Sequence, residues 1–265
     1  MSRLKWDETG KRFYENGVDH GVLFVMGKNS TYSNGVPWNG LIAINESPSG
    51  AEANPLYADN VKYLNLIAAE NFGATIEAFS CPEEFSVCDG AVAVVPGLKL
   101  GQQSRKMFGL CYRTKVGNDI AGIEYGYKLN FVYGCLAAPS ERNHQTVNDT
   151  PETMTLSWTV TTTPIDVPGL KPTAHLVVDS RKTSSEVMSL LEDLIYGTEF
   201  IPGTSEVDPV DAIDPHLPSP AAVLHLINEG TPYEEIDESL LDDSGNRILD
   251  DSGNDILARH MVIMA

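Results

Sequence analysis

Apolar and polar side chains alternate through the middle of this chain with the period of two that is typical of β-strands. In residues 154–161, Met154, Leu156, Trp158 and Val160 alternate with serine and threonine. Similar alternation runs through residues 107–113 and 125–134. Strands with one apolar and one polar face build half-buried antiparallel sheets. The pattern therefore predicts three strands, each with one buried face.

Shorter apolar runs between turn residues predict further strands. Asn34-Gly35 precedes one of these runs, and Pro96-Gly97 ends another. The segments predicted as additional strands are residues 21–26, 36–44, 61–67, 75–80, 90–95 and 174–179. The chain is therefore expected to be mainly β.

One segment shows helical rather than strand periodicity. Thr183 followed by Glu186 matches a capping box, and Gly197 stands where a C-terminal cap belongs. Five apolar side chains between these positions form one stripe, which should pack on a sheet. The stripe consists of Val187, Leu190, Leu191, Leu194 and Ile195. Farther on, Ser219-Pro220 could begin a short helix, although the following residues would also suit a strand.

Residues 46–60 form a long segment rich in serine, proline, glycine and alanine. Loops of more than about 12 residues in a compact domain tend to be functional or disordered. Two interpretations follow: a solvated surface loop, or a loop that becomes ordered against a neighbouring subunit.

The end of the chain differs in composition from the rest. Residues 201–218 are rich in proline and aspartate and predict a linker. An eight-residue unit is then repeated over residues 241–256, with Asp-Ser-Gly-Asn as its centre. Tight turns between short strands are the simpler interpretation, and a calcium site is the alternative, although the spacing does not match an EF-hand. We therefore divide the chain into a β domain, 1–200, and an acidic extension or small subdomain, 201–265.

Composition supports a folded protein outside membranes. Hydrophobic residues make up 42% of the 265 positions, which is enough for a sizeable core. No apolar run approaches the length of a transmembrane helix, and the N-terminus lacks the apolar core of a signal peptide. Four cysteines occur without a CxxC pair, so buried thiols are favoured over a metal site or disulfide framework.

The net charge of −19 is concentrated at one end. Residues 201–265 hold 14 acidic and two basic residues. Basic residues elsewhere do not cluster with aromatic ones. An acidic surface repels phosphate, which argues against tight nucleic-acid binding but not against DNA passing by.

No catalytic motif stands out. The six histidines lack the spacing of helix-borne metal ligands, and the HExxH, GxSxG and GxGxxG patterns are absent. A distant carboxylate pair of the glycosidase type stays open. We therefore expect no catalytic residues, no cofactor and no metal.

Several motifs, in order, resemble one known family. They are residues 35–40 (GVPWNG), 46–52 (ESPSGAE), 101–114 (GQQSRKMFGLCYRT), 117–119 (GND), 126–134 (GYKLNFVYG) and 157–164 (SWTVTTTP). Their order and spacing resemble the major tail tube proteins of long-tailed siphoviruses that infect Gram-positive bacteria. The resemblance covers roughly residues 10–200, and the acidic end lies outside it.

This resemblance implies an antiparallel β-sandwich or barrel-like fold flanked by one α-helix. It implies six copies in a ring, with rings stacked head to tail into a hollow tube in the phage virion, assembled in the host cytoplasm. Such contacts close in one direction and stay open along the axis. The implied partners are other copies, the tape-measure protein, and the tail terminator and initiator proteins. DNA would pass through the lumen without specific binding, and no membrane is involved.

In related tubes an extended loop contacts the next ring. Residues 46–60 are therefore our hypothesis for the inter-ring contact, helped by the N-terminal arm. We further expect the acidic end to face outward. The residues assigned to the inter-ring contact are Glu46, Ser47, Pro48, Ser49, Gly50, Ala51, Glu52, Asn54, Tyr57 and Asn60.

Two other classes compete with a structural assembly protein. One is a β-sandwich that decorates a virion or binds a cell surface through its acidic end. The other is a hydrolase that uses unrecognised carboxylates. Self-assembly would separate the first class from a tube protein, and a hydrolysis screen would address the second.

Overall fold

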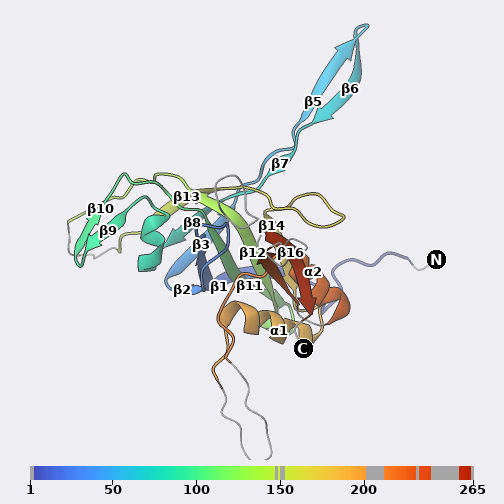
Figure 1. The fold of residues 1–265 in the computed structure, drawn as a ribbon. Helices are drawn as coiled ribbons and strands as arrows, with labels where there is room; N and C mark the ends of the chain where they lie inside the picture. Colours follow the sequence, from blue (N-terminus) through green and yellow to red (C-terminus); the bar gives the residue numbers. More distant parts are fainter. Residues whose placement is uncertain are drawn as a thin grey trace, which may run out of the picture.

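The computed structural model describes residues 3–146, 149, 153–200, 212–230, 233–239 and 257–263, the last two as backbone alone. Its main feature is an eight-stranded antiparallel sheet with the order β2-β1-β11-β12-β13-β8-β3, in which β14 also pairs with β12 (Figure 1). The fold is thus mainly β, as the sequence predicted. The strands are β1 (Phe13–Val25), β2 (Val36–Trp38), β3 (Leu41–Glu46), β8 (Gly73–Ala78), β11 (Phe108–Asn118), β12 (Gly122–Ala137), β13 (Leu156–Thr162) and β14 (His175–Asp179).

Strand β12 changes its partner partway along its length. Its middle pairs with β14, from Lys128 to Val132, and its end pairs with β13, from Cys135 to Ala137. Gly134 lies at the change, with φ of +58°. A Cβ atom there would lie 2.3 Å from the carbonyl oxygen of Thr163, so only glycine fits. Gly134 therefore allows β12 to pair with β14 on one side of this position and with β13 on the other.

A tight corner joins the two edge strands of the sheet. The sequence predicted a single strand over residues 36–44, but the chain turns between Trp38 and Leu41. Gly40 adopts φ of +80°, and its carbonyl accepts a hydrogen bond from the Phe79 amide at 2.8 Å. β2 therefore pairs with β1 while β3 pairs with β8. The two edge strands, β2 and β3, do not pair with each other, so the described sheet is not a closed barrel.

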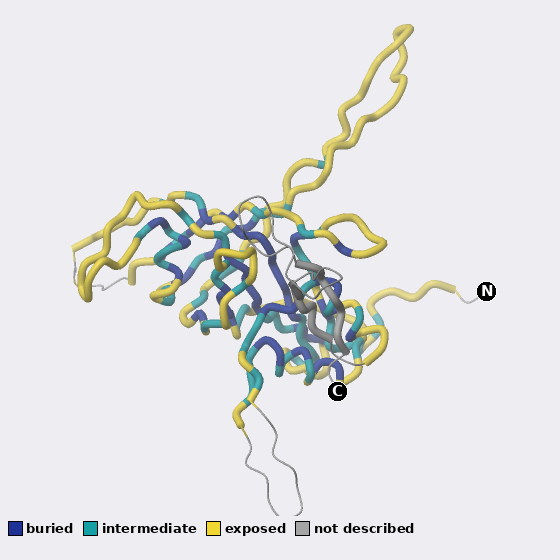
Figure 2. The backbone as a smooth tube through the Cα atoms, viewed as in Figure 1, coloured by how far each residue is buried: buried dark blue, intermediate teal, exposed yellow. Residues whose placement is uncertain are grey.

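Two hydrophobic clusters lie on opposite faces of the central strands. The inter-strand core fills the space among β1, β8, β11, β12 and β13, where Trp158 and Ile76 are buried together with Phe85 of the 3₁₀ helix η1 (Glu83–Val87). The helix-side core lies on the other face, beneath the helices. Figure 2 shows this buried centre inside an exposed periphery.

The expectation of half-buried strands is right for β13 and wrong for the middle of the sheet. In β13, Trp158 and Val160 are buried while Thr159 and Thr161 are exposed. In β11, every residue from Phe108 to Tyr112 is buried. The difference arises because the helices cover the second face of β11, which local alternation cannot reveal.

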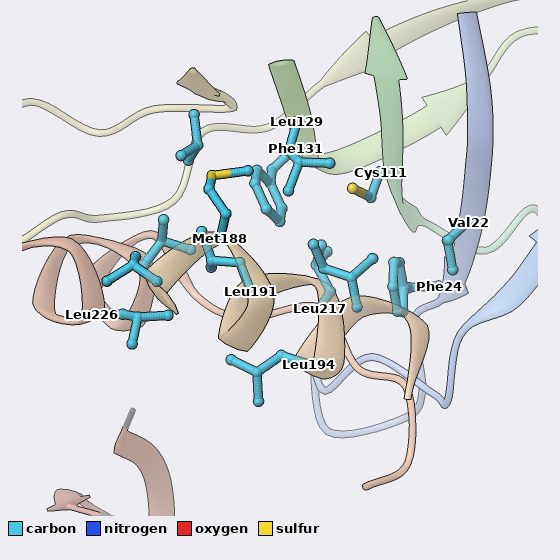
Figure 3. Close-up of a cluster of buried hydrophobic side chains, with 14 of the residues drawn as sticks. Val22, Phe24, Cys111, Leu129, Phe131, Met188, Leu191, Leu194, Leu217 and Leu226 are labelled. Carbon is cyan, nitrogen blue, oxygen red and sulfur yellow. The ribbon is translucent and has the colours of Figure 1, made fainter. Parts of the chain in front are cut away.

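Two helices, rather than one, flank the sheet within the described residues. They are α1 (Ser185–Tyr196) and α2 (Pro220–Glu229). Figure 3 shows Met188 and Leu191 of α1 pointing toward Phe131 of β12. Of the predicted stripe, Leu190 is partly buried against the helix-side core. The other four stripe residues are buried within it: Val187, Leu191, Leu194 and Ile195.

The segment that follows Ser219-Pro220, for which the sequence suited either a helix or a strand, is the helix α2. Ser219 is its N-cap and accepts a hydrogen bond from the Ala222 amide at 3.1 Å. Pro220 occupies the first helical position, where its missing N–H costs nothing. Val223 and Leu226 then pack into the helix-side core together with Leu217 from the preceding segment.

The structure moves the cap of α1 by one residue from the predicted capping box. Ser184, not Thr183, is the N-cap, and its hydroxyl accepts a hydrogen bond from the Val187 amide at 3.3 Å. We predict that Ser184→Ala lowers the free energy of unfolding by about 1 kcal/mol, whereas Thr183→Ala changes it little. Urea unfolding of both variants checks this. Equal losses would contradict the assignment.

Beyond α2, the chain forms a separate antiparallel ribbon of β15 (Tyr233–Ser239) and β16 (Leu257–Ile263). The repeat over residues 241–256, with its calcium alternative, lies outside the described residues. Most of the predicted linker, residues 201–211, also lies outside them.

Candidate assembly surfaces

A long hairpin leaves the sheet between β3 and β8 and projects away from the body (Figure 1). We call residues 47–72 the arm. Near the body β4 (Ser49–Gly50) pairs with β7 (Glu70–Asn71), and farther out β5 (Ala53–Ala58) pairs with β6 (Val61–Ile67). The tip turns at Asp59 and Asn60, whose φ values are +50° and +64°. Aspartate and asparagine tolerate this left-handed region better than other non-glycine residues do.

The arm corrects the prediction of a loop over residues 46–60. That segment is the outgoing half of the hairpin, and residues 61–67, predicted as a strand, are the returning half. The structure brings the ten residues of the inter-ring hypothesis together on or beside this half. Glu46 ends β3, Ser49 and Gly50 form β4, Asn54 and Tyr57 belong to β5, Asn60 lies at the tip, and Ser47, Pro48, Ala51 and Glu52 lie between strands.

No other part of the described chain covers the apolar side chains of the arm. Every residue of β5 and β6 is exposed (Figure 2). Tyr57 and Tyr63 are 70% and 72% exposed. An isolated two-stranded hairpin is at best marginally stable in water, and clustered exposed apolar groups mark interaction sites. The other large apolar side chains exposed here are Leu56, Val61, Leu64, Leu66 and Ile67.

The root of the arm is held by side chains from three other strands. The Tyr112 hydroxyl donates a hydrogen bond to Glu46 Oε1 at 2.9 Å. Thr162 Oγ1 donates to the carbonyl oxygen of Phe72 at 2.6 Å. The Phe72 ring stacks on His175, with centroids 4.4 Å apart. Both ends of the arm are thus tied to the body.

Burial shifts the pKa values of two side chains at the root of the arm. It raises the pKa of Tyr112, with Glu46 adding to the effect, so the hydroxyl stays protonated as a donor. His175 Nε2 is buried without a hydrogen-bond partner among the described residues and lies 4.0 Å from Glu46 Oε1. Burial lowers the pKa of His175, and the nearby Glu46 carboxylate opposes the shift only in part.

The lowered pKa of His175 predicts a dependence of stability on pH. The unfolded chain binds the proton more tightly than the folded one, so stability falls as pH drops below the ordinary histidine value of 6.5. The loss is complete once pH is below the folded pKa. His175→Phe, which keeps the ring beside Phe72, should flatten this part of the curve between pH 7 and 5. Urea unfolding at each pH checks it, and parallel curves for variant and wild type would contradict it.

A second exposed hairpin precedes β11. We call residues 90–106 the short ribbon, in which β9 (Val92–Val95) pairs with β10 (Leu98–Leu100) around Pro96-Gly97. All residues of both strands are exposed. Its exposed large apolar side chains are Val92, Val94, Val95, Leu98 and Leu100.

An open groove of about 1060 Å³ lies beside the start of α2. Two tyrosine hydroxyls at the groove already serve the fold. The Tyr133 hydroxyl donates to the carbonyl oxygen of Pro218 at 2.9 Å, and that of Tyr32 accepts from the Gly134 amide at 2.9 Å.

The described residues contain no cluster of three or more histidine, cysteine or carboxylate groups that could hold a metal ion. Cys88, Cys111 and Cys135 are buried as free thiols, and Cys81 is partly buried. Burial raises the pKa of all four, which keeps them protonated. No helix in the described part of the chain is long and apolar enough to cross a membrane.

No protein-family model and no curated protein matches the chain. Among solved structures, the chain is similar to part of a cryo-EM structure of the sheath–tube complex of an extracellular contractile injection system, PVC, in its extended state. The match covers 66% of this chain and 94% of that chain, with 13% identity and a TM-score of 0.27. A similarity this weak carries no functional argument, so a functional proposal must rest on the surfaces described above.

Proposed function

We propose that this chain is a structural subunit of a phage tail tube. Copies associate into rings, six per ring by the family resemblance, and the rings stack into a hollow tube through which DNA is ejected. The uncovered apolar arm is the observation that carries this proposal. Its outgoing half corresponds to residues 46–60, the segment that the sequence resemblance assigns to the inter-ring contact.

The arm suits contact with another subunit better than it suits a role within one chain. Its apolar side chains touch no second layer of the described chain, and its root is anchored to the sheet by hydrogen bonds from Tyr112 and Thr162. Because both ends of the arm are tied to the sheet, ordering the arm against a neighbour costs less conformational entropy than ordering a free chain segment would. Contact between the arm of one copy and the body of the next is heterologous, which is the contact that rings and stacks require.

Charge supports a conduit for DNA rather than a nucleic-acid-binding protein. The net charge is −19, and three arginines of the body are committed to carboxylates. These pairs are Arg113 with Asp19, Arg181 with Asp179, and Arg105 with Asp89. A wall without free basic clusters would let DNA slide past. The tape-measure protein, the tail terminator and initiator, and a place in the virion complete the proposal, which includes no enzymatic activity.

Self-assembly of the purified full-length chain tests the proposal. Concentrated protein should form rings or stacked tubes with a central hole in negative-stain electron microscopy. A decoration or cell-surface module should instead stay small at every concentration, as measured by mass photometry. Persistent small particles would therefore contradict the tube proposal and favour that second class.

A further inference from the structure

The arm and the short ribbon carry charges of opposite sign. Along the arm, residues 47–72, the charged side chains are Glu52, Asp59 and Glu70 against Lys62 alone. The short ribbon, residues 90–106, has three basic residues and no acidic one, in a chain with 37 acidic and 18 basic residues. The basic residues of the short ribbon are Lys99, Arg105 and Lys106.

The two hairpins also share unpaired strand edges and exposed apolar side chains. Each is a two-stranded sheet whose outer edges pair with no other strand among the described residues. Each exposes several large apolar side chains. Strand addition between chains pairs such open edges and buries apolar side chains beside them.

The hairpins of one copy are placed apart from each other. Figure 1 shows the arm and the short ribbon leaving the body in different directions, the arm upward and the ribbon to the left. The arm therefore does not cover the ribbon of its own chain. Any pairing between them joins two copies.

We propose that the arm of one copy docks along the short ribbon of a neighbouring copy and extends it into a four-stranded sheet. This inference deepens the proposed function, on which it rests, by naming the surface that receives the arm. Apolar side chains of the two paired edge strands lie next to one another, and acidic groups of the arm lie near basic groups of the ribbon. The docked copy still has a free arm for a third copy, so the contact propagates.

Among the ribbon charges, Lys99 is the best placed to meet an arm. Arg105 is already committed, with Nη1 3.4 Å from Asp89 Oδ1 and 3.1 Å from the carbonyl oxygen of Ala137. Lys99 lies in exposed β10, and its ammonium group donates to the neutral Ser86 hydroxyl at 3.0 Å. It forms no ion pair with a carboxylate in the part of the chain that the structure describes.

Charge reversal tests the docking. Lys99→Glu should raise the protein concentration needed for assembly about tenfold at low salt, because like charges then face each other. The arm variant Glu52→Lys/Glu70→Lys should do the same. Combining all three changes should restore assembly toward the wild-type concentration. Lys171→Glu, which reverses a charge in the exposed loop between β13 and β14, is the matched control and should have no effect.

Zero-length carbodiimide cross-linking of the wild type gives a second readout that needs no variant. Mass spectrometry should find an intermolecular link between Lys99 or Lys106 and Glu52 or Glu70. If the wild type assembles but Lys99→Glu assembles equally well and no such link forms, the docking is overturned while the proposed function stands. If the wild type never assembles and no link forms, both are overturned.

Discussion

A variant whose arm is cut back to its root should fold like the wild type and fail to assemble. Replacing residues 51–69 with Asn-Gly connects Gly50 to Glu70 through a two-residue turn, and these two residues already face each other across β4 and β7. Asn-Gly favours the type I′ turn that such a short connection needs. The removed residues include the exposed strands β5 and β6 but nothing from the two hydrophobic cores. Stability should therefore change little while self-association disappears.

The cut has to fall at the root of the arm, because the arm is a hairpin and its two paired halves must be removed together. Removing only residues 47–54 would delete β4 and the first two residues of β5, which leaves β7 without its partner and shortens the pairing of β5 with β6. The matched control is Asp59→Asn/Asn60→Gly at the tip, which keeps the turn and the apolar strands and should assemble normally. Sedimentation velocity at several concentrations measures assembly, and circular dichroism measures the fold. An arm-less variant that still forms wild-type assemblies would show that the arm is not the contact.

Removal of the indole at position 158 should produce the largest loss of stability in the molecule. Trp158 is completely buried in the inter-strand core, with ring centroids 5.0 Å from Phe85 and 5.7 Å from Trp38. Trp158→Ala leaves a cavity that the paired β8 and β13 cannot easily close. We expect the free energy of unfolding to fall by about 3–5 kcal/mol.

Two further variants of the same strand make the test specific. Thr159→Ala changes an exposed neighbour and should have little effect. Trp158→Phe should cost less than Trp158→Ala, because it keeps an aromatic ring in the core. It also removes an indole N–H that is buried and has no hydrogen-bond partner in the described part of the chain. Urea unfolding of the arm-less monomer measures all three. A loss below about 1 kcal/mol for Trp158→Ala would mean that this core is not packed as described.

The sequence predicted individual strands and helices better than it predicted which faces of the strands other elements cover. The alternation around Trp158 predicted β13 and its buried face, since that strand has solvent on one side. The same argument was wrong for Phe108–Tyr112, because burial of the second face depends on helices more than 70 residues away. The turn at Gly40 was missed although Asn39-Gly40 is a typical turn dipeptide. The apolar residues on either side of this dipeptide favoured one continuous strand, whereas in the structure they pair with two different strands.

The candidate site was recognised in part. Serine, proline and glycine around residues 47–55 are typical of loops, and they concealed a strand whose stability depends on pairing with residues 61–67. A hairpin could have been suspected from Asp59-Asn60 between two apolar runs. The short ribbon was half recognised as a strand at residues 90–95, ended by Pro96-Gly97. Its lack of acidic residues is visible in the sequence, but that lack gains meaning only once the arm is seen to be acidic and uncovered.

Negative-stain electron microscopy of the concentrated wild-type protein, beside the arm-less variant, tests the central claim most directly. We predict rings and stacked tubes with a continuous central channel for the wild type, and monomers without rings or stacks for the variant. A wild-type protein that stays monomeric as its concentration rises, or that forms only closed dimers, would contradict the account.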